Sequence, residues 1–382
     1  MTSPTKPLLL RVARIIATVL SRFVVPVTVF KTTGIMPYVE AQTVPHILRA
    51  YADTPLFTEP PPSSSGGKLV WSASQRKRPS KTHLASVPSG IVFPTGAVFD
   101  HRGQFVEMVS HDYDFLDNPQ QKKHRFVLRP HRVFPRIHRF RHDVVTLTAS
   151  NQKFYFHWIF EILPRLWLAE QAGCGGGPFF VEAELPFQQQ TLGVLGVTEP
   201  RRIDPLEMGA ISASNLIIPC HRIAPGHAFP EWSIRFLRDR LLPKANEGRR
   251  SSPKRLYVSR RNARHRRVLN EPEIVSFLAG YGFQSIQAEE LTFCDQMSLF
   301  RDAEIVIAPH GGGLANLVFC TPGAKVIELF PPVNIDLYYR FATQLGLNYL
   351  FVKSGDSPLT FMRPEDYHID LAELKTVLDG AM

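Results

Sequence analysis

The segment with the clearest chemistry is a histidine followed by three glycines: His310, Gly311, Gly312 and Gly313. The apolar run 303–308 predicts a buried strand just before them, and a short helix is expected to begin near Leu314. Glycines let the backbone approach a ligand, and the free N–H groups of such a loop and of a helix start attract an anion. His310 could donate to a phosphate oxygen, and Asn316 could hold the loop or reach a ribose. The pattern indicates a diphosphate site, although a tight turn that needs glycine only for packing is an alternative.

A second expected strand, 255–259, runs into a series of basic residues. Parallel strands end at the same edge of a sheet, so these residues should lie beside the glycine loop. Arginine holds phosphate through two parallel hydrogen bonds and stays charged when it is desolvated. We predict that three residues bind the diphosphate: Ser259, Arg260 and Arg264. The other arginines are interpreted as solvated surface: Arg261, Arg266 and Arg267.

Glu328 comes late in the expected strand 325–330 and is placed at a third strand terminus. At that position a carboxylate could accept hydrogen bonds from the hydroxyl groups of a ribose or a sugar. Glu328 is therefore a further candidate for the ligand site, and a surface carboxylate without a ligand is the alternative.

His157 and Glu161 stand four residues apart in an apolar segment that predicts a buried helix over about 155–172. This spacing places both side chains on one face of the helix, where they need partners or a cleft to face. Either one could take a proton from a hydroxyl group near neutral pH. We predict that one of them is a general base, and a histidine and glutamate paired inside the fold is the alternative. Pro164 within the segment suggests a kink.

Alternating strands and helices predict the framework that positions these residues. Two pairs with capping spacing mark helix starts: Asn270 with Glu273, and Thr292 with Asp295. The alternation is typical of an α/β fold with parallel strands and with helices on both faces. A chain of 382 residues exceeds the usual size of one hydrophobic core, so two domains with a cleft between them are expected.

The composition predicts four segments. Residues 1–85 combine an amphipathic opening with a linker rich in proline, serine and glycine, and residues 86–243 form a first Rossmann-like domain. Residues 244–254 form a polar linker, and residues 255–382 form a second Rossmann-like domain that carries the diphosphate site.

The formal net charge of +10 predicts attraction to anions, which include nucleic acid, acidic lipid, acidic polymers and phosphorylated ligands. No nucleic-acid-binding module accompanies the charge, so nucleic acid is not the expected partner. The four cysteines lack the spacing of a zinc site and are interpreted as reduced thiols, mostly buried, which favours the cytoplasm. Residues 1–30 have arginines on one helical side and apolar residues on the other. This pattern fits peripheral contact with the inner face of a membrane, and packing on the protein itself is the alternative.

Three segments together resemble glycosyltransferase family 61: 154–168, 255–283 and 291–330. In order and spacing they look like the histidine-tryptophan helix, the Tyr-x-Ser-Arg strand and the His-Gly-Ala-Gly-like loop of that family. The resemblance covers roughly residues 88–355. Two positions depart from it, because alanine is commoner in the family where Gly312 stands and tyrosine where Phe156 stands.

The resemblance implies a GT-B-like arrangement of the two domains, an inverting mechanism and no obligatory metal or other cofactor. It makes a nucleotide-sugar the expected donor, bound mainly by the second domain, with the first domain on the acceptor side. The expected acceptor is a glycan, a lipid-linked sugar or a protein, within polysaccharide biosynthesis such as that of a capsule. Asp112 and Asp114 have the DxD spacing of metal-dependent glycosyltransferases. They lie away from the expected strand ends and are interpreted as a solvated turn.

Two other functions fit parts of the sequence. A non-catalytic basic module would bind nucleic acid or an acidic polymer, with an affinity that falls steeply with salt concentration. A nucleotide-sugar epimerase or hydrolase would share the architecture without consuming an acceptor.

Overall fold

The computed structural model describes residues 82–103, 105–106, 109–110, 137–223, 228–245, 252–332, 335–355 and 365–382. It also gives the backbone of three short strands, β1 (His46–Ala50), β2 (Ser63–Ser64) and β3 (Gly67–Lys68). The opening 1–30 and the pair Asp112 and Asp114 lie outside the described residues. We call residues 82–245 the first half of the chain and residues 252–382 the second half.

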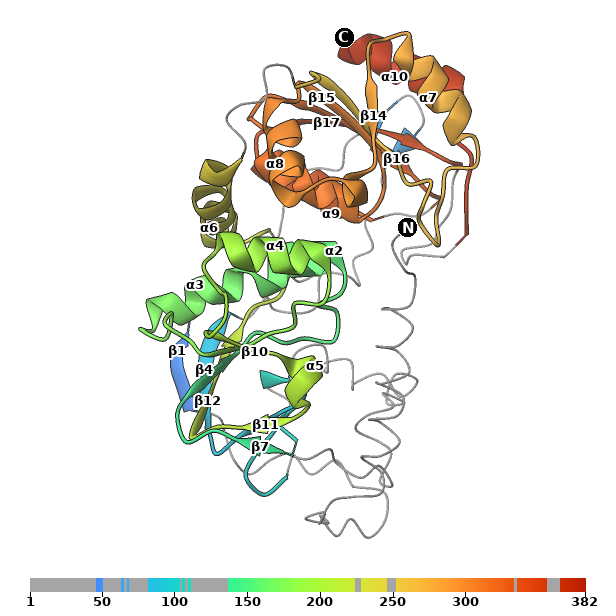
Figure 1. The fold of residues 1–382 in the computed structure, drawn as a ribbon. Helices are drawn as coiled ribbons and strands as arrows, with labels where there is room; N and C mark the ends of the chain where they lie inside the picture. The colour runs from blue at the N-terminus through green and yellow to red at the C-terminus, as the bar shows by residue number, and fades with distance from the viewer. Residues whose placement is uncertain are drawn as a thin grey trace, which may run out of the picture.

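The first half contains two sheets (Figure 1). The larger has the order β1-β4-β12-β8-β9-β10 and is parallel from β12 to β10, whereas β4 runs antiparallel to both of its neighbours. Its other strands are β4 (His83–Pro88), β8 (Val144–Thr146), β9 (Phe179–Phe180), β10 (Arg202–Ile203) and β12 (Asn215–Cys220). The smaller sheet has the order β6-β5-β11-β7, with β5 (Ile91–Val92), β6 (Val98–Phe99), β7 (His138–Arg139) and β11 (Ile211–Ser212).

The expected helix over 155–172 is divided into three consecutive segments. They are α2 (Tyr155–His157), the π-helical turn η4 (Trp158–Ile162) and α3 (Pro164–Gln171). Pro164 has no N–H group to donate to the carbonyl of Phe160, and the Leu163 N–H donates instead to the Trp158 carbonyl at 3.0 Å, five residues earlier. His221 Nε2 donates to the free Phe160 carbonyl at 3.0 Å. The predicted kink at Pro164 is therefore a change of helix type, stabilised by a distant histidine.

The remaining helices of the first half are α4 (Pro186–Val194), α5 (Pro205–Met208), α6 (Glu231–Leu241) and the 3-10 helix η5 (Leu242–Lys244). Among the described helices of the chain, none has both the length and the apolar character needed to cross a bilayer.

The second half is built on a parallel five-stranded sheet of order β14-β13-β15-β16-β17. Its strands are β13 (Arg255–Val258), β14 (Gln284–Ile286), β15 (Ile305–Pro309), β16 (Lys325–Phe330) and β17 (Asn348–Lys353). In Figure 1, α7 (Glu271–Ala279) and α10 (Leu371–Ala381) cover one face, and α8 (Phe293–Asp302) and α9 (Leu337–Gln344) cover the other. The 3-10 helices are η6 (Ala288–Glu290) and η7 (Gly312–Phe319). The α/β prediction is confirmed, whereas a GT-B arrangement of two Rossmann-like domains and the expected domain boundaries stay predictions.

Only one of the two expected capping pairs forms. The Thr292 hydroxyl accepts from the Asp295 N–H at 3.1 Å and donates to the Asp295 carboxylate at 2.7 Å. The prediction for Asn270 is wrong, because its side chain makes no bond to the start of α7. Its amide instead exchanges two hydrogen bonds with the backbone of Ile369, ninety-nine residues later in the chain.

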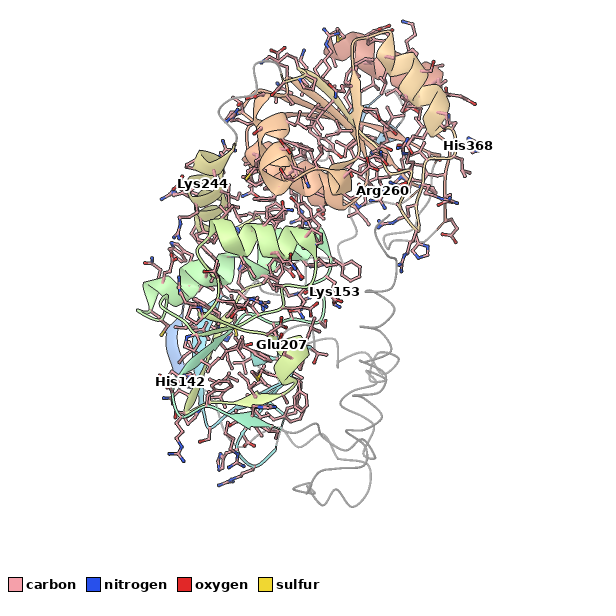
Figure 2. All side chains as sticks on the ribbon, viewed as in Figure 1. His142, Lys153, Glu207, Lys244, Arg260 and His368 are labelled. Carbon is pink, nitrogen blue, oxygen red and sulfur yellow. The ribbon has the colours of Figure 1, made fainter. Side chains whose placement is uncertain are left out.

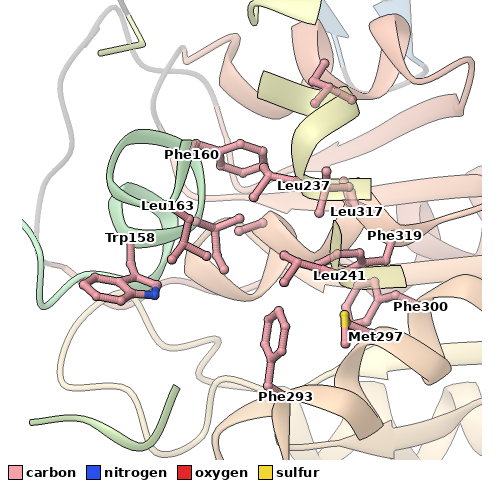
Figure 3. Packing of buried hydrophobic residues seen from close by; sticks show 14 of the residues in the cluster. Trp158, Phe160, Leu163, Leu237, Leu241, Phe293, Met297, Phe300, Leu317 and Phe319 are labelled. Carbon is pink, nitrogen blue, oxygen red and sulfur yellow. The ribbon is translucent and has the colours of Figure 1, made fainter. Parts of the chain in front are cut away.

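One hydrophobic cluster runs through both halves (Figure 3). Phe160 from the π-helical turn meets Phe341 of α9 edge to face, with ring centroids 4.7 Å apart. Burial of an aromatic side chain of this size contributes about 2–3 kcal/mol. The Arg238 guanidinium of α6 donates to the Val318 and Cys320 carbonyls at the end of η7. The two halves are therefore held together by packing and by hydrogen bonds, and not only by the chain that joins them.

Candidate functional site

The glycine loop connects the end of β15 to η7 and lies against an arginine. A Cβ at Gly311 would overlap the Arg260 guanidinium group, so a side chain there would require that group to shift. A Cβ at Gly312 would make an ordinary contact with Tyr155 at 3.7 Å, which fits the alanine that is commoner at this position in the resembling family. A Cβ at Gly313 would come within 3.1 Å of Val258, so packing alone explains this glycine. Gly311 is the glycine that brings the loop backbone next to a positive charge.

The His310 side chain is oriented by Glu328. His310 Nδ1 pairs with Glu328 Oε1, and the Tyr349 hydroxyl donates to Glu328 Oε2 at 2.6 Å. Glu328 is fully buried inside β16, which continues to Phe330. The expectation that Glu328 ends a strand is therefore wrong, and its carboxylate is occupied by two side chains instead of facing a ribose. Because Nδ1 is held, Nε2 is the ring nitrogen of His310 that remains for a ligand.

Asn316 holds the glycine loop in place. It is fully buried in η7, where its Oδ1 accepts from the Tyr155 hydroxyl at 2.6 Å and its Nδ2 donates to Gln296 Oε1 at 2.8 Å. Both ends of the amide are used inside the protein. This geometry favours the loop-holding role over a contact with ribose.

Ser259 and Arg260 follow β13 and are fixed by their own loop. The Ser259 hydroxyl is buried and accepts from the Arg261 N–H at 3.2 Å. Arg260 donates from its backbone N–H to Glu271 Oε1 at 3.0 Å and from Nη2 to the His265 carbonyl at 3.2 Å. Its Nε atom is buried and has no hydrogen-bond partner within the described part of the chain.

Arg266 lies close to Arg260, so its interpretation as solvated surface is wrong. Arg266 is half-buried and has a left-handed backbone, with φ of 58°. Burial lowers the pKa of Arg266, and the positive charge of Arg260 lowers it further. Arg264, which the sequence placed in the site, is exposed. The positions of the arginines in the sequence do not show which side chain turns inward, because that depends on the left-handed backbone at Arg266.

The two guanidinium groups form a site with excess positive charge. Within the described residues, neither Arg260 nor Arg266 forms an ion pair with a carboxylate, and burial weakens the screening of their repulsion. An anion between them would replace repulsion by attraction and could also accept from amides of the glycine loop. The arrangement is chemically suited to a phosphate or diphosphate group.

His157 and Glu161 form a hydrogen-bonded pair in which the histidine is the accessible member. His157 Nδ1 and Glu161 Oε2 are 2.8 Å apart, and their side chains are 37% and 4% exposed. Asn151 Nδ2 donates to the same carboxylate oxygen at 3.0 Å, and the Ile223 N–H donates to the other at 3.1 Å. Burial by itself would raise the pKa of Glu161, but these hydrogen bonds and the attraction to His157 lower it to about 2. The carboxylate therefore stays charged and orients the ring through Nδ1, so that His157 would take up a proton at its other ring nitrogen, Nε2.

The His157 turn and the arginine site lie on facing sides of the two halves. Figure 2 shows Arg260 on the side of the second half that faces the first half, and Lys153, close to His157 in the chain, on the opposing side. Direct contact between Tyr155 and the glycine loop supports this placement. Within the described residues, no group of three or more histidine, cysteine, aspartate or glutamate side chains could hold a metal ion.

Acid should destabilise the region around the His157 turn. Burial lowers the pKa of His221 from 6.5 to about 4, so the unfolded chain binds more protons in this interval. The contribution of the neutral His221 to the free energy of unfolding is fully present above pH 6.5. It falls by roughly 3 kcal/mol as the pH falls toward 4. The charged Glu161 adds a second loss between pH 4.5 and 2. Urea titrations should show the free energy of unfolding decreasing from pH 7 to pH 4, and this pH dependence should be weaker in His221→Asn. An increase in the free energy of unfolding toward pH 4 would contradict the lowered pKa of His221.

The match to a known family falls on the same segments. Residues 155–327 match the family described as Glycosyltransferase 61. The EGF domain-specific O-linked N-acetylglucosamine transferase of Drosophila melanogaster is 30% identical over 141 residues, which cover 33% of this chain and 26% of that protein. The transferases of the same description from Canis lupus familiaris and Gallus gallus are 27% identical over 132 residues and 24% identical over 173 residues. These matches cover 33% and 44% of this chain and 25% and 31% of the two relatives.

The family match spans the His157 turn, the arginine site and the glycine loop, and it ends at Ile327, one residue before Glu328. Residues 155–327 of the chain therefore match the model of glycosyltransferase family 61, and the resemblance seen in the sequence is confirmed. The chain spans about a quarter to a third of the length of the curated relatives it matches.

Proposed function

We propose that this chain is an inverting glycosyltransferase that moves a sugar from a nucleotide-diphosphate donor to a hydroxyl group of a glycan, a lipid-linked sugar or a protein, in polysaccharide biosynthesis. The observation that carries the proposal is the pair Arg260 and Arg266, two partly buried cations without a carboxylate partner in the described residues, of which Arg260 lies against the glycine loop at Gly311. A diphosphate supplies the missing negative charge. The family 61 region favours sugar transfer over other uses of such a site.

The leaving diphosphate is stabilised by the second half of the chain. Arg260 and Arg266 bind the phosphate oxygens, amides of the glycine loop donate to them, and the His310 ring lies beside them in the orientation that Glu328 imposes. As the bond between the anomeric carbon and the phosphate oxygen breaks, its electron pair moves to the phosphate. Donors already aimed at that oxygen stabilise the growing charge without reorganisation.

The acceptor hydroxyl is activated by the first half of the chain. His157 Nε2 takes the hydroxyl proton while the oxygen attacks the anomeric carbon from the side opposite the leaving diphosphate. A single in-line displacement inverts the configuration at that carbon. Glu161 stabilises the imidazolium that forms, as a buried carboxylate does for a histidine base.

Incubation of the full-length chain with UDP-, GDP- and CMP-sugars and candidate acceptors tests the proposed function. Release of nucleotide together with a glycosylated product is expected. Sugar conversion or hydrolysis without consumption of acceptor would indicate an epimerase or hydrolase. No binding to any nucleotide tried would contradict the donor assignment.

Replacing Glu328 with glutamine should lower kcat by about 10- to 100-fold, because an uncharged partner holds the His310 ring less firmly. Tyr349→Phe removes only the hydroxyl that bonds to Glu328 and should have a smaller effect. Steady-state kinetics, with calorimetry of nucleotide binding, separate turnover from affinity. Full activity of Glu328→Gln would show that the carboxylate only stabilises the fold.

Activity should survive chelation of metal ions. We propose that arginines, histidine and loop amides take the place of a cation, because a divalent ion among Arg260, Arg266 and His310 would add like charge to the site. Turnover in EDTA should equal turnover in buffer, and Asp112→Ala should change it little. Loss of turnover in EDTA with recovery on addition of manganese, together with an inactive Asp112→Ala, would contradict this assignment.

We further propose a cytoplasmic location with peripheral contact at the inner face of the membrane. The support is the amphipathic pattern of residues 1–30 and four free cysteines, of which Cys220 and Cys320 are buried. Deletion of residues 1–30 should release the protein from a membrane fraction at low salt. A full-length protein that is absent from that fraction would contradict membrane contact.

A further inference from the structure

The turn that carries His157 is joined directly to the glycine loop. Tyr155 lies two residues before His157, and its hydroxyl donates to Asn316 Oδ1 at 2.6 Å. Asn316 belongs to η7, the helix that begins within the glycine loop at Gly312. This hydrogen bond crosses from the first half of the chain to the second.

A second contact reaches the same loop from the neighbouring residue. The Phe156 ring meets the Tyr338 ring edge to face, with centroids 6.0 Å apart and planes at 89°. The Tyr338 hydroxyl in turn donates to the Gly311 carbonyl at 2.7 Å, and its ring lies 5.4 Å from the His310 ring. Tyr155 therefore bonds directly to η7, Phe156 reaches the loop through Tyr338, and His157 follows immediately.

The hydrogen bond to Asn316 has no ready replacement. Asn316 is fully buried, so water cannot easily take the place of the Tyr155 hydroxyl, and an unpaired carbonyl oxygen there is costly. A change in the position of η7 is therefore passed to Tyr155 and, through the backbone of α2, to His157. Coupling of this kind is reciprocal between the two sites.

We infer that Tyr155 is a positioning residue that couples the occupied donor loop to the placement of His157. The inference rests on the proposed function, because it assumes that the loop binds the donor diphosphate. Binding of nucleotide at Gly311–Gly313 fixes η7, the Tyr155–Asn316 hydrogen bond transmits that order, and the base is then aligned for the acceptor. Loss of the hydroxyl should disturb turnover more than donor binding.

Hydrogen–deuterium exchange of the full-length chain with UDP or GDP tests the coupling. In the unmodified protein, bound nucleotide should slow exchange both at residues 311–319 and at residues 157–163. In Tyr155→Phe, protection at 311–319 should remain and protection at 157–163 should be lost. The kcat should fall about tenfold, with donor KM changed by less than about threefold.

Thr191→Val is the matched control. It removes the α4 hydroxyl that accepts from Trp158 Nε1 of the π-helical turn at 2.8 Å, a buried hydrogen bond of similar length that stays within the first half. This variant should retain protection in both segments and the normal kcat. Tyr338→Phe loses only the bond to the Gly311 carbonyl and serves as the test if Tyr155→Phe does not fold. It should weaken protection at 157–163.

The outcomes separate the inference from the proposed function. No protection at 311–319 by any nucleotide would overturn the proposed function and the inference with it. Protection at 311–319 without protection at 157–163 in the unmodified protein would overturn the coupling alone. Equal losses in Tyr155→Phe and Thr191→Val would also overturn it, because the effect would then be one of general stability.

Discussion

Replacing His157 with glutamine should lower kcat by about 10²- to 10⁴-fold, the contribution of a positioned general base. Glutamine retains a polar side chain that can reach Glu161 but cannot take the acceptor proton. The affinity for nucleotide diphosphate should stay within a few-fold, because the base lies on the acceptor side. Kinetics and calorimetry on the same protein preparation separate the two quantities.

His142→Gln is the matched control, since His142 is an exposed histidine of the first half whose ring bonds to the carbonyl of Asp143. It should retain normal turnover. Glu161→Gln should keep part of the activity, because its amide can still orient the ring but no longer stabilises the imidazolium. Nearly full turnover in His157→Gln would show that the His157 and Glu161 pair only stabilises the fold.

Replacing Arg260 with alanine should lower kcat/KM by about 10²- to 10³-fold, as expected when one donor to a developing charge is lost from a partly buried site. Arg266→Ala should have an effect of similar size, because Arg266 is partly buried and its positive charge acts on that of Arg260. Arg260→Lys keeps the charge without the paired hydrogen bonds and should recover only part of the activity. Initial rates over a range of donor concentrations measure these differences.

The other arginines of the loop provide the comparison. Arg261 is exposed and its Nε donates to Gln287, so Arg261→Ala should change kcat/KM little. Arg264→Ala distinguishes two expectations, because the linear sequence placed Arg264 in the site and the structure leaves it exposed. A large loss in Arg264→Ala with a normal Arg266→Ala would contradict the arrangement proposed here.

The sequence by itself determined the framework of the second half and the position of its loops. Ile305–Pro309 is apolar throughout, as a strand buried on both faces must be, and β15 lies there in a parallel sheet. His310–Gly313 and Ser259 follow strand ends, where parallel strands deliver their loops to one edge. Thr292 caps α8, because capping depends on residues only three apart.

Tertiary structure alone decided which side chains meet. Glu328 pairs with His310 because two neighbouring parallel strands are in register, and Asn270 pairs with Ile369 instead of capping its own helix. Arg266 turns inward through a left-handed backbone that no spacing rule signals. His221 completes the π-helical turn because Pro164 leaves a carbonyl free, and Tyr155 reaches Asn316 across the two halves. Local patterns predict helices and strands, whereas hydrogen bonds between distant residues depend on how the elements pack, which a linear pattern does not contain.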